Sequence, residues 1–177
     1  MQFPFHKFHE LKWNLVWQSL ACAFYMAFVL FVMGVSASNS LMWAAGASSL
    51  ASSAYSVFAV PQSLVAEPKR ILSGYVIGCT VGTLVHFLFK YFLQGQLFSP
   101  VENLDPHFFW IFAAISVVAT LVLMVLWGAQ HPPAVGMALI MVMNVSDPRM
   151  FLGIAVSIVV LVGIRKFFSK QLKNLVE

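Results

Sequence analysis

Long apolar stretches, separated by short polar segments, run from one end of the chain to the other. A helix needs about 20 mostly apolar residues to cross the hydrocarbon core of a membrane. Each stretch of that length therefore predicts a transmembrane α-helix. Five stretches qualify: 13–35, 41–60, 71–93, 108–128 and 150–168. We expect an all-α integral membrane protein.

A sixth apolar stretch, 132–145, is too short to cross a membrane on its own. Its 14 residues extend about 21 Å as a helix, against roughly 30 Å of hydrocarbon. It begins within the sequence Gln130-His131-Pro132-Pro133-Ala134, whose two prolines cannot donate backbone hydrogen bonds. Irregular backbone at membrane depth is tolerated only where protein covers it or water reaches it. We therefore expect a loop that dips into the membrane, followed by one short broken helix.

The distribution of basic residues indicates that this short helix crosses. If the short helix crosses and the N-terminus is inside, the basic residues on the outer side are Lys90 and Arg149. Lys90 is close enough to the surface to extend its ammonium into water. The inner side carries many more: Lys7, Lys12, Lys69, Arg70, Arg165, Lys166, Lys170 and Lys173. Since cytoplasmic loops are enriched in Lys and Arg, we expect both termini in the cytoplasm and the protein in a bacterial inner membrane.

The chain also repeats a short pattern at a distance of 80 residues. Glu67-Pro68-Lys69 precedes one long span, and Asp147-Pro148-Arg149 precedes another. Each triplet opens the last helix of a set of three, and because three is odd, the two sets would be inverted relative to each other. Inverted repeats with an interrupted helix recur in transporters, where the substrate binds near the midplane. The expected organisation is an interfacial segment (1–12), a first three-helix repeat (13–93), an extracytoplasmic loop (94–107), a second repeat (108–168) and a basic cytoplasmic tail (169–177).

Composition narrows the classes of function. Charged residues make up 9% of the chain, far below the roughly 25% of a globular protein. The net charge of +4 could suggest a nucleic-acid partner, but the basic residues flank the spans and form no groove. Orientation in the bilayer explains them better. We expect a lipid bilayer as the surrounding medium and no nucleic acid as a partner, and six short helices are compatible with a homo-oligomer.

The start of the short helix is the best candidate for a binding site. Pro132 and Pro133 suit the first turn of a helix, where backbone N–H groups lack partners. Free N–H groups from Ala134 onward, together with the helix dipole, would favour a small anion. His131 could donate a hydrogen bond to that anion, or it could instead cap Ala134 or satisfy a carbonyl. An ionisable residue inside a membrane is a candidate for function, so both interpretations stay open.

Small residues in the second and third spans add to this site. Four serines of the second span occupy the position in the first repeat that the His131 loop holds in the second, although serine hydroxyls also bond back to their own helix. They are Ser48, Ser49, Ser52 and Ser53. Glycines at four-residue spacing in the third span predict close helix packing, with the second span as the expected partner. These glycines are Gly74, Gly78 and Gly82.

Acidic residues are absent from every predicted span. Because proton-coupled transporters relay protons through buried carboxylates, a passive channel, or one gated by histidine, fits better than carboxylate coupling. We expect no enzymatic activity and no cofactor. His6, His9 and Glu10 share a helical face, but three ligands on an exposed helix are weak support for a metal site, and none is expected.

The residues around the tripeptide resemble the HPP family of integral membrane proteins, named for a histidine-proline-proline motif. The similarity extends over residues 60–162. Gly74 and Gly82 fit the glycine-spaced span of the family, and Ala138-Leu139 fits the helix after the motif. A stretch before the third span also fits, at Pro61, Ser63, Ala66, Pro68 and Lys69.

The resemblance implies a transporter with several spans, and chloroplast and cyanobacterial members are linked to nitrite. The chain departs from the family in two places. Val135-Gly136-Met137 replaces a Gly-Ala-Thr sequence, which removes a hydroxyl from the helix start, and Glu67 replaces a glutamine at the expected inner entrance beside Lys69 and Arg70. We expect a transporter or channel for a small inorganic anion, with nitrite as the first candidate.

Two alternatives remain. One is a redox protein that binds haem through His86 and His131. Depth argues against it, because His86 lies about 22 Å into its span, whereas His131 follows a span that has just returned to the inner side. The other is an assembly protein without transport activity, whose glycine stripe packs against a partner.

Overall fold

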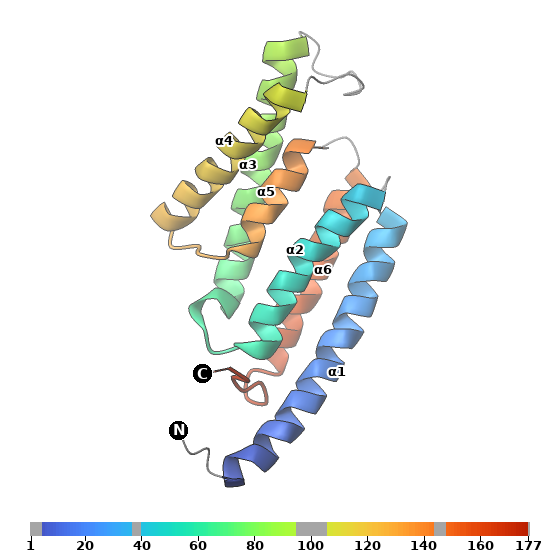
Figure 1. Cartoon of the computed structure of the whole chain (residues 1–177), viewed down its shortest axis with the longest axis vertical. Coiled ribbons are helices and arrows are strands. Elements are labelled where there is room, and N and C mark those ends of the chain that lie inside the picture. Colours follow the sequence, from blue (N-terminus) through green and yellow to red (C-terminus); the bar gives the residue numbers. More distant parts are fainter. Residues whose placement is uncertain (1–4, 37–39, 95–105, 144–147, 177) are drawn as a thin grey trace.

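The computed structural model describes residues 5–36, 40–94, 106–143 and 148–176, and these residues form six α-helices and one 3₁₀ turn (Figure 1). Side chains are described within 13–35, 43–92, 110–142 and 149–176. The elements are α1 (Phe5–Ser36), α2 (Ser40–Ala59), η1 (Leu64–Ala66), α3 (Pro68–Gln94), α4 (Pro106–Leu126), α5 (Pro133–Met143) and α6 (Pro148–Phe167). The predicted all-α class is confirmed.

Three of these helices contain stretches long and apolar enough to cross a membrane. The stretches are Trp13–Val35 in α1, Pro68–Phe92 in α3 and Arg149–Phe167 in α6. The first coincides with the predicted span 13–35. Shorter apolar stretches occupy α4 and α5, and α2 forms where the span 41–60 was predicted. These helices support an integral membrane protein.

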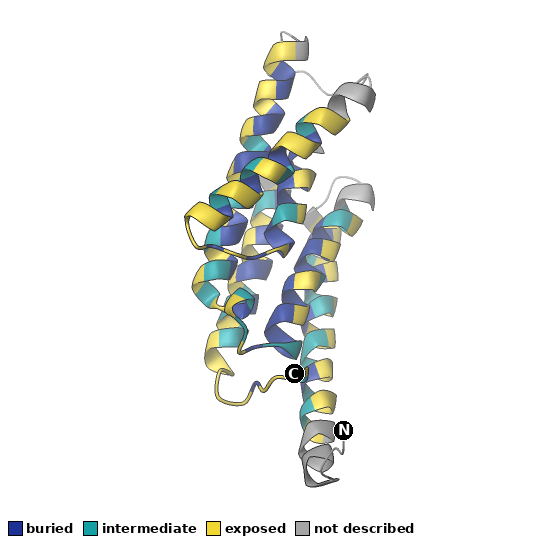
Figure 2. Ribbon diagram, turned by 60° about the vertical axis from the view of Figure 1, so that its left-hand side comes forward, coloured by how far each residue is buried: buried dark blue, intermediate teal, exposed yellow. Residues whose placement is uncertain are grey.

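The helices run alternately in opposite directions, so that the two ends of the chain lie at the same end of the bundle (Figure 1). The short helix α5 is central, since it contacts α2, α3 and α4. On the far side, α1 contacts α2 and α6. Exposed residues lie along the outer faces of the helices (Figure 2). Large apolar side chains are among them, such as Phe24 (76% exposed) and Leu126 (74% exposed). Such surfaces suit contact with lipid.

The glycine stripe of α3 faces α5, and the expectation that it packs against the second span is wrong. A Cβ added to Gly78 would overlap the backbone oxygen of Ala134, and one added to Gly82 would overlap that of Ala138. A Cβ at Gly74 would lie 2.8 Å from the Cβ of His131. In lipid, where apolar burial gives little driving force, close backbone approach supplies the packing that holds helices together. The stripe therefore sets how closely α5 docks.

The C-terminal segment, predicted as a basic tail (169–177), folds back onto the bundle. Leu172 is buried, and the backbone N–H of Leu175 donates to the carbonyl of Ala59 at the end of α2 (2.8 Å). Gln18 of α1, itself fully buried, accepts from the N–H of Lys173 and donates to its carbonyl, both at 3.0 Å. It also donates to the carbonyl of Phe58. These bonds satisfy backbone groups that would otherwise be buried without partners.

At the other end of the chain, α1 is continuous from Phe5. Residues 5–12, expected in an interfacial segment, therefore extend the first span without a break. The side chains of His6, His9 and Glu10 lie outside the described residues. So do residues 95–105, which make up most of the predicted loop 94–107, and Asp147 of the second triplet.

Replacing Gln18 by leucine is expected to release the C-terminal segment. The change leaves the backbone groups of Lys173 and the carbonyl of Phe58 without partners, at a cost of about 1–3 kcal/mol. Cleavage by trypsin after Lys170 and Lys173 should become about tenfold faster, because proteolysis follows the population of the open state. Gln171→Leu, at an exposed position of the same segment, is the control. Equal cleavage rates for the two variants would contradict the role of Gln18.

Candidate functional site

The helix α5 begins inside the bundle, away from the nearby ends of α2 and α3. Ser53, which bonds His131, lies six residues before the last residue of α2, and Gly74 lies six residues after the first residue of α3. At 1.5 Å per residue, the turn before α5 therefore lies about 9 Å inside both helix ends. That depth is roughly a third of the hydrocarbon core.

The chain reaches this turn through a glycine that ends α4. Gly128 has a φ of 62°, a left-handed conformation that favours glycine. Its N–H donates to the carbonyl of Val125 (3.2 Å), and the N–H of Ala129 donates to that of Met124 (2.8 Å). This pair of bonds is the Schellman motif, in which a glycine satisfies the last carbonyls of a helix. It directs the chain back toward α3.

The first N–H groups of α5 are occupied, so the expectation that they are free is wrong for two residues. The N–H of Ala134 donates to the carbonyl of His131, and that of Val135 donates to the carbonyl of Pro132, both at 3.0 Å. A tight turn of this kind is one of the usual ways in which a helix end satisfies its unpaired donors. The dipole of α5 still makes its start electropositive, but these two donors are not available to a ligand.

His131 is fully buried and uses both nitrogens of its ring. Nδ1 donates to the carbonyl of Val65 in η1 (2.8 Å), and because a carbonyl only accepts, Nδ1 must carry a proton. Nε2 lies 2.8 Å from Oγ of Ser53 in α2. That Oγ lies 2.7 Å from the hydroxyl of Tyr75 in α3. Of the two interpretations, the one in which His131 satisfies a carbonyl agrees with these contacts. The imidazole also links η1 to α2 and, through Ser53, to α3.

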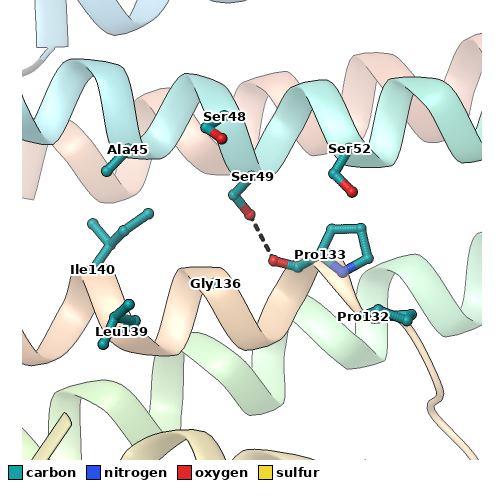
Figure 3. Close-up of a pocket in the computed structure, with 9 residues that line it drawn as sticks. All are labelled: Ala45, Ser48, Ser49, Ser52, Pro132, Pro133, Gly136, Leu139 and Ile140. Atoms are coloured by element: carbon teal, nitrogen blue, oxygen red, sulfur yellow. Dashed lines mark hydrogen bonds between the residues drawn. The ribbon is translucent and has the colours of Figure 1, made fainter.

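A groove lies between α2 and α5, on the other side of the turn (Figure 3). It has a volume of about 400 Å³. The hydroxyl of Ser49 donates to the carbonyl of Pro133 (2.7 Å) and so ties its two walls together. The lining residues are Ala45, Ser48, Ser49, Ser52, Pro132, Pro133, Gly136, Leu139 and Ile140. None of these nine is charged, so a bound solute would meet hydroxyls on one wall and mainly apolar groups on the other.

Two serine hydroxyls are available to a solute. Ser48 and Ser52 are exposed one turn apart on α2, and within the described part of the chain neither hydroxyl makes a hydrogen bond. Across from them, Gly136 of α5 leaves the groove open, because a Cβ added there would meet no atom within 4 Å. The groove can therefore donate hydrogen bonds to a small anion or dipolar solute.

The structure divides the predicted site residues into two groups. Ser49, Ser52, Pro132 and Pro133 line the groove. The others, Ser53, His131 and Ala134, are buried behind it. Tyr75 of the buried network was missed, because a tyrosine in a span carries no signal of its own. Ser48, considered with the other serines, also lines the groove. Four further residues of the groove were not assigned, although helical periodicity relates them to predicted positions: Ala45, Gly136, Leu139 and Ile140.

The three residues expected at an inner entrance gather at the start of α3. Nε of Arg70 lies 2.9 Å from a carboxylate oxygen of Glu67, and Lys69 is exposed beside them. None of the three lines the groove. They lie at the end of the bundle that holds both chain termini (Figure 1).

The transmembrane region of the HPP family matches residues 9–173 of the chain. The chain belongs to the HPP family. This match is wider than the stretch 60–162 on which the sequence resemblance rested, and it includes α1 and most of the docked C-terminal segment. His131, Pro132 and Pro133 are thus the family tripeptide, placed at the turn between α4 and α5.

A transmembrane protein of Dictyostelium discoideum is 30% identical to this chain over 99 residues. The matched stretch covers 56% of this chain and 30% of that relative, so the chain corresponds to less than a third of the relative's length. No solved structure matches the chain.

Proposed function

We propose that this HPP family member transports a small inorganic anion across the membrane, as a channel or carrier, and that nitrite is the first anion to test. Membership of a membrane family and the apolar helices support a role in the bilayer. The observation that carries the proposal is the groove at the start of α5, about a third of the way into the bundle. Helices that are broken within the membrane form the substrate sites of many transporters.

The groove suits an anion that gives up its water easily. The free hydroxyls of Ser48 and Ser52 replace part of the hydration shell, and the electropositive start of α5 lies beside them. Leu139 and Ile140 form an apolar wall that favours weakly hydrated ions. Since the groove holds no fixed positive charge, binding is weak enough for release, as conduction requires.

The wider architecture proposed here is an inverted repeat. The helices α3 and α6 both begin at the proline of an acidic-proline-basic triplet, 80 residues apart, and they run in opposite directions (Figure 1). Five full crossings and the short α5 would place both termini on one side. The basic residues at the end with the termini support a cytoplasmic location for it, in a bacterial inner membrane.

The contacts of His131 and of the glycine stripe support the two alternatives, a haem-binding redox protein and an assembly protein, less well than they support a transporter. A haem that used His86 and His131 as ligands requires a free nitrogen on each, whereas both nitrogens of His131 are hydrogen-bonded and buried. An assembly protein would use its glycine stripe to bind a partner. Here the stripe contacts α5 of the same chain.

Filling the groove tests the proposal. Gly136→Leu places a side chain in open space between α2 and α5 and should reduce nitrite flux into proteoliposomes by about tenfold or more, as expected when binding weakens by 1.4 kcal/mol. The same change should not reduce stability, because leucine is preferred over glycine in a helix by roughly 0.5–1 kcal/mol. Gly163→Leu is the matched control, at an exposed glycine of α6 with equally open surroundings.

Flux is measured for nitrite, nitrate, formate and chloride with the native chain and both variants. The proposal expects native flux of at least one anion, a large loss in Gly136→Leu and no loss in Gly163→Leu. Flux no faster than in protein-free liposomes for all four anions would overturn transport of small anions. Equal flux in the two variants would overturn the groove as the route.

A further inference from the structure

Lys90 of α3 is buried in the bundle without a counter-charge. Its side chain is 6% exposed, so the expectation that its ammonium extends into water at the outer surface is wrong. Among the residues that the structure describes, it forms no hydrogen bond and no ion pair. The sequences of α3, α4 and α5 contain no aspartate or glutamate. Nothing described on these three helices compensates the charge of Lys90.

His86 lies one turn before Lys90 on the same face of α3 and is 2% exposed. Its Nδ1 lies 2.7 Å from the carbonyl of Val142, near the end of α5. Because that carbonyl only accepts, Nδ1 carries the proton, and Nε2 has no partner among the described residues. Two basic side chains one turn apart thus share one face of α3, and the helices α3, α4 and α5 supply no acid to pair with them.

We infer that His86 and Lys90 form a second binding site for a small inorganic monovalent anion, at the opposite end of α5 from the groove. This inference rests on the proposed transport function and extends it. An anion bound at the ammonium of Lys90 would supply the missing counter-charge, and protonation of His86 would let Nε2 donate to the same anion. Ionisable residues kept inside a membrane bundle usually mark an ion pathway.

The end of α5 does not by itself explain the buried lysine. The carbonyls that end a helix carry partial negative charge and attract cations. That attraction is weaker than the cost of removing an ammonium group from water without an ionic partner. A bound anion compensates the charge fully, whereas a helix end compensates only part of it.

The two sites are separated along the helices α3 and α5. Gly74 lies beside the turn at His131, and His86 is 12 residues further along α3, which is about 18 Å of helix. The helix α5 runs between the same two places, since its first turn borders the groove and its Val142 bonds His86. The groove and the His86–Lys90 pair therefore lie toward opposite ends of α5.

Binding is tested on the purified full chain with thiocyanate as the probe, because its infrared band shifts when the ion leaves water. Lys90→Met removes the charge and keeps an unbranched apolar side chain. It should weaken thiocyanate binding about 10- to 100-fold, the loss expected for a charge-assisted hydrogen bond. Lys90→Arg keeps the charge and should bind within about threefold of the native chain. Lys166→Met, at an exposed lysine of α6, is the control for charge loss elsewhere.

His86→Asn tests the second ligand. The asparagine amide replaces Nδ1 and keeps the bond to Val142, but it has nothing in the position of Nε2. It should weaken thiocyanate binding less than Lys90→Met does and leave the melting temperature without anion near the native value. If His86→Asn binds as the native chain does, the imidazole is no ligand, and the site as proposed is wrong.

Melting temperatures with and without anion distinguish loss of the second site from misfolding of a variant and from loss of transport. Added nitrite or thiocyanate should raise the melting temperature of the native chain and not that of Lys90→Met, which should itself melt higher without anion because it buries no charge. Nitrite flux with unaltered binding in Lys90→Met would overturn the second site and leave the groove in place. Anion binding lost in Lys90→Met, without flux in any variant, would support the site and overturn transport. No thiocyanate binding to the native chain would overturn the site.

Discussion

Replacing Gly78 by alanine is expected to disrupt the docking of α5 and to lower the free energy of unfolding by about 3 kcal/mol. The added Cβ would overlap the backbone oxygen of Ala134, and a backbone group in a packed helix cannot rotate away as a side chain can. Overpacking of a well-filled interface usually costs about 1–3 kcal/mol, and a clash with backbone belongs at the upper end. Because α5 forms one wall of the groove, its displacement should also reduce the proposed transport.

Gly163→Ala is the matched control for this prediction. Both glycines lie within long helices, but a Cβ at Gly163 would meet no atom within 4 Å. Alanine there should raise stability by up to about 1 kcal/mol through helix propensity alone. Thermal unfolding in detergent, followed by tryptophan fluorescence, compares the two variants. If both gain stability, α3 and α5 do not approach as closely as the structure shows.

The sequence alone predicted the elements of the fold well, because periodicity and length carry that information. The first span was placed at 13–35, and helices formed where spans 71–93 and 150–168 were predicted, although α3 and α6 begin two or three residues earlier, at Pro68 and Pro148. The short α5 was predicted from the lack of apolar length and from the proline pair. These are local properties of the chain, and they fix which residues are helical.

Contacts between distant segments were predicted less well. The glycine stripe was correctly seen as unusual, but its partner is α5, since four-residue spacing shows that a helix packs closely and not which helix it meets. The docking of the C-terminal segment was missed for a similar reason. Its partner, Gln18, is a single amide in an apolar span, and the groups that it bonds are backbone groups of Lys173 and Phe58.

The candidate site shows the same limit. The tripeptide and the serines of α2 were assigned to one place in advance, and they do lie together. Which side of the turn each one faces was not predictable, because it depends on the rotation of α2 about its axis. Ser52 faces the groove and Ser53 the buried network, although they are neighbours in the chain. The carbonyl of Val65 carries no signal in the sequence at all.

Replacing His131 by alanine is expected to lower the free energy of unfolding by about 1–3 kcal/mol, because the carbonyl of Val65 loses its donor in a buried place. Ser53 is less affected, since its hydroxyl also lies 2.7 Å from that of Tyr75 and 3.4 Å from the carbonyl of Ser49. His131→Asn, whose amide nitrogen can take the place of Nδ1, should therefore recover most of the loss. His131→Gln, which matches Nε2 instead, should recover less.

Anion flux measured on the same variants separates the structural role of this histidine from a direct one. If His131 only holds the turn in place, His131→Asn should transport nitrite within about threefold of the native rate, a difference below 1 kcal/mol, while His131→Ala loses flux together with stability. A stable His131→Asn protein without flux would instead show that the imidazole itself acts on the anion or on a proton. The buried ring and its two occupied nitrogens favour the first outcome.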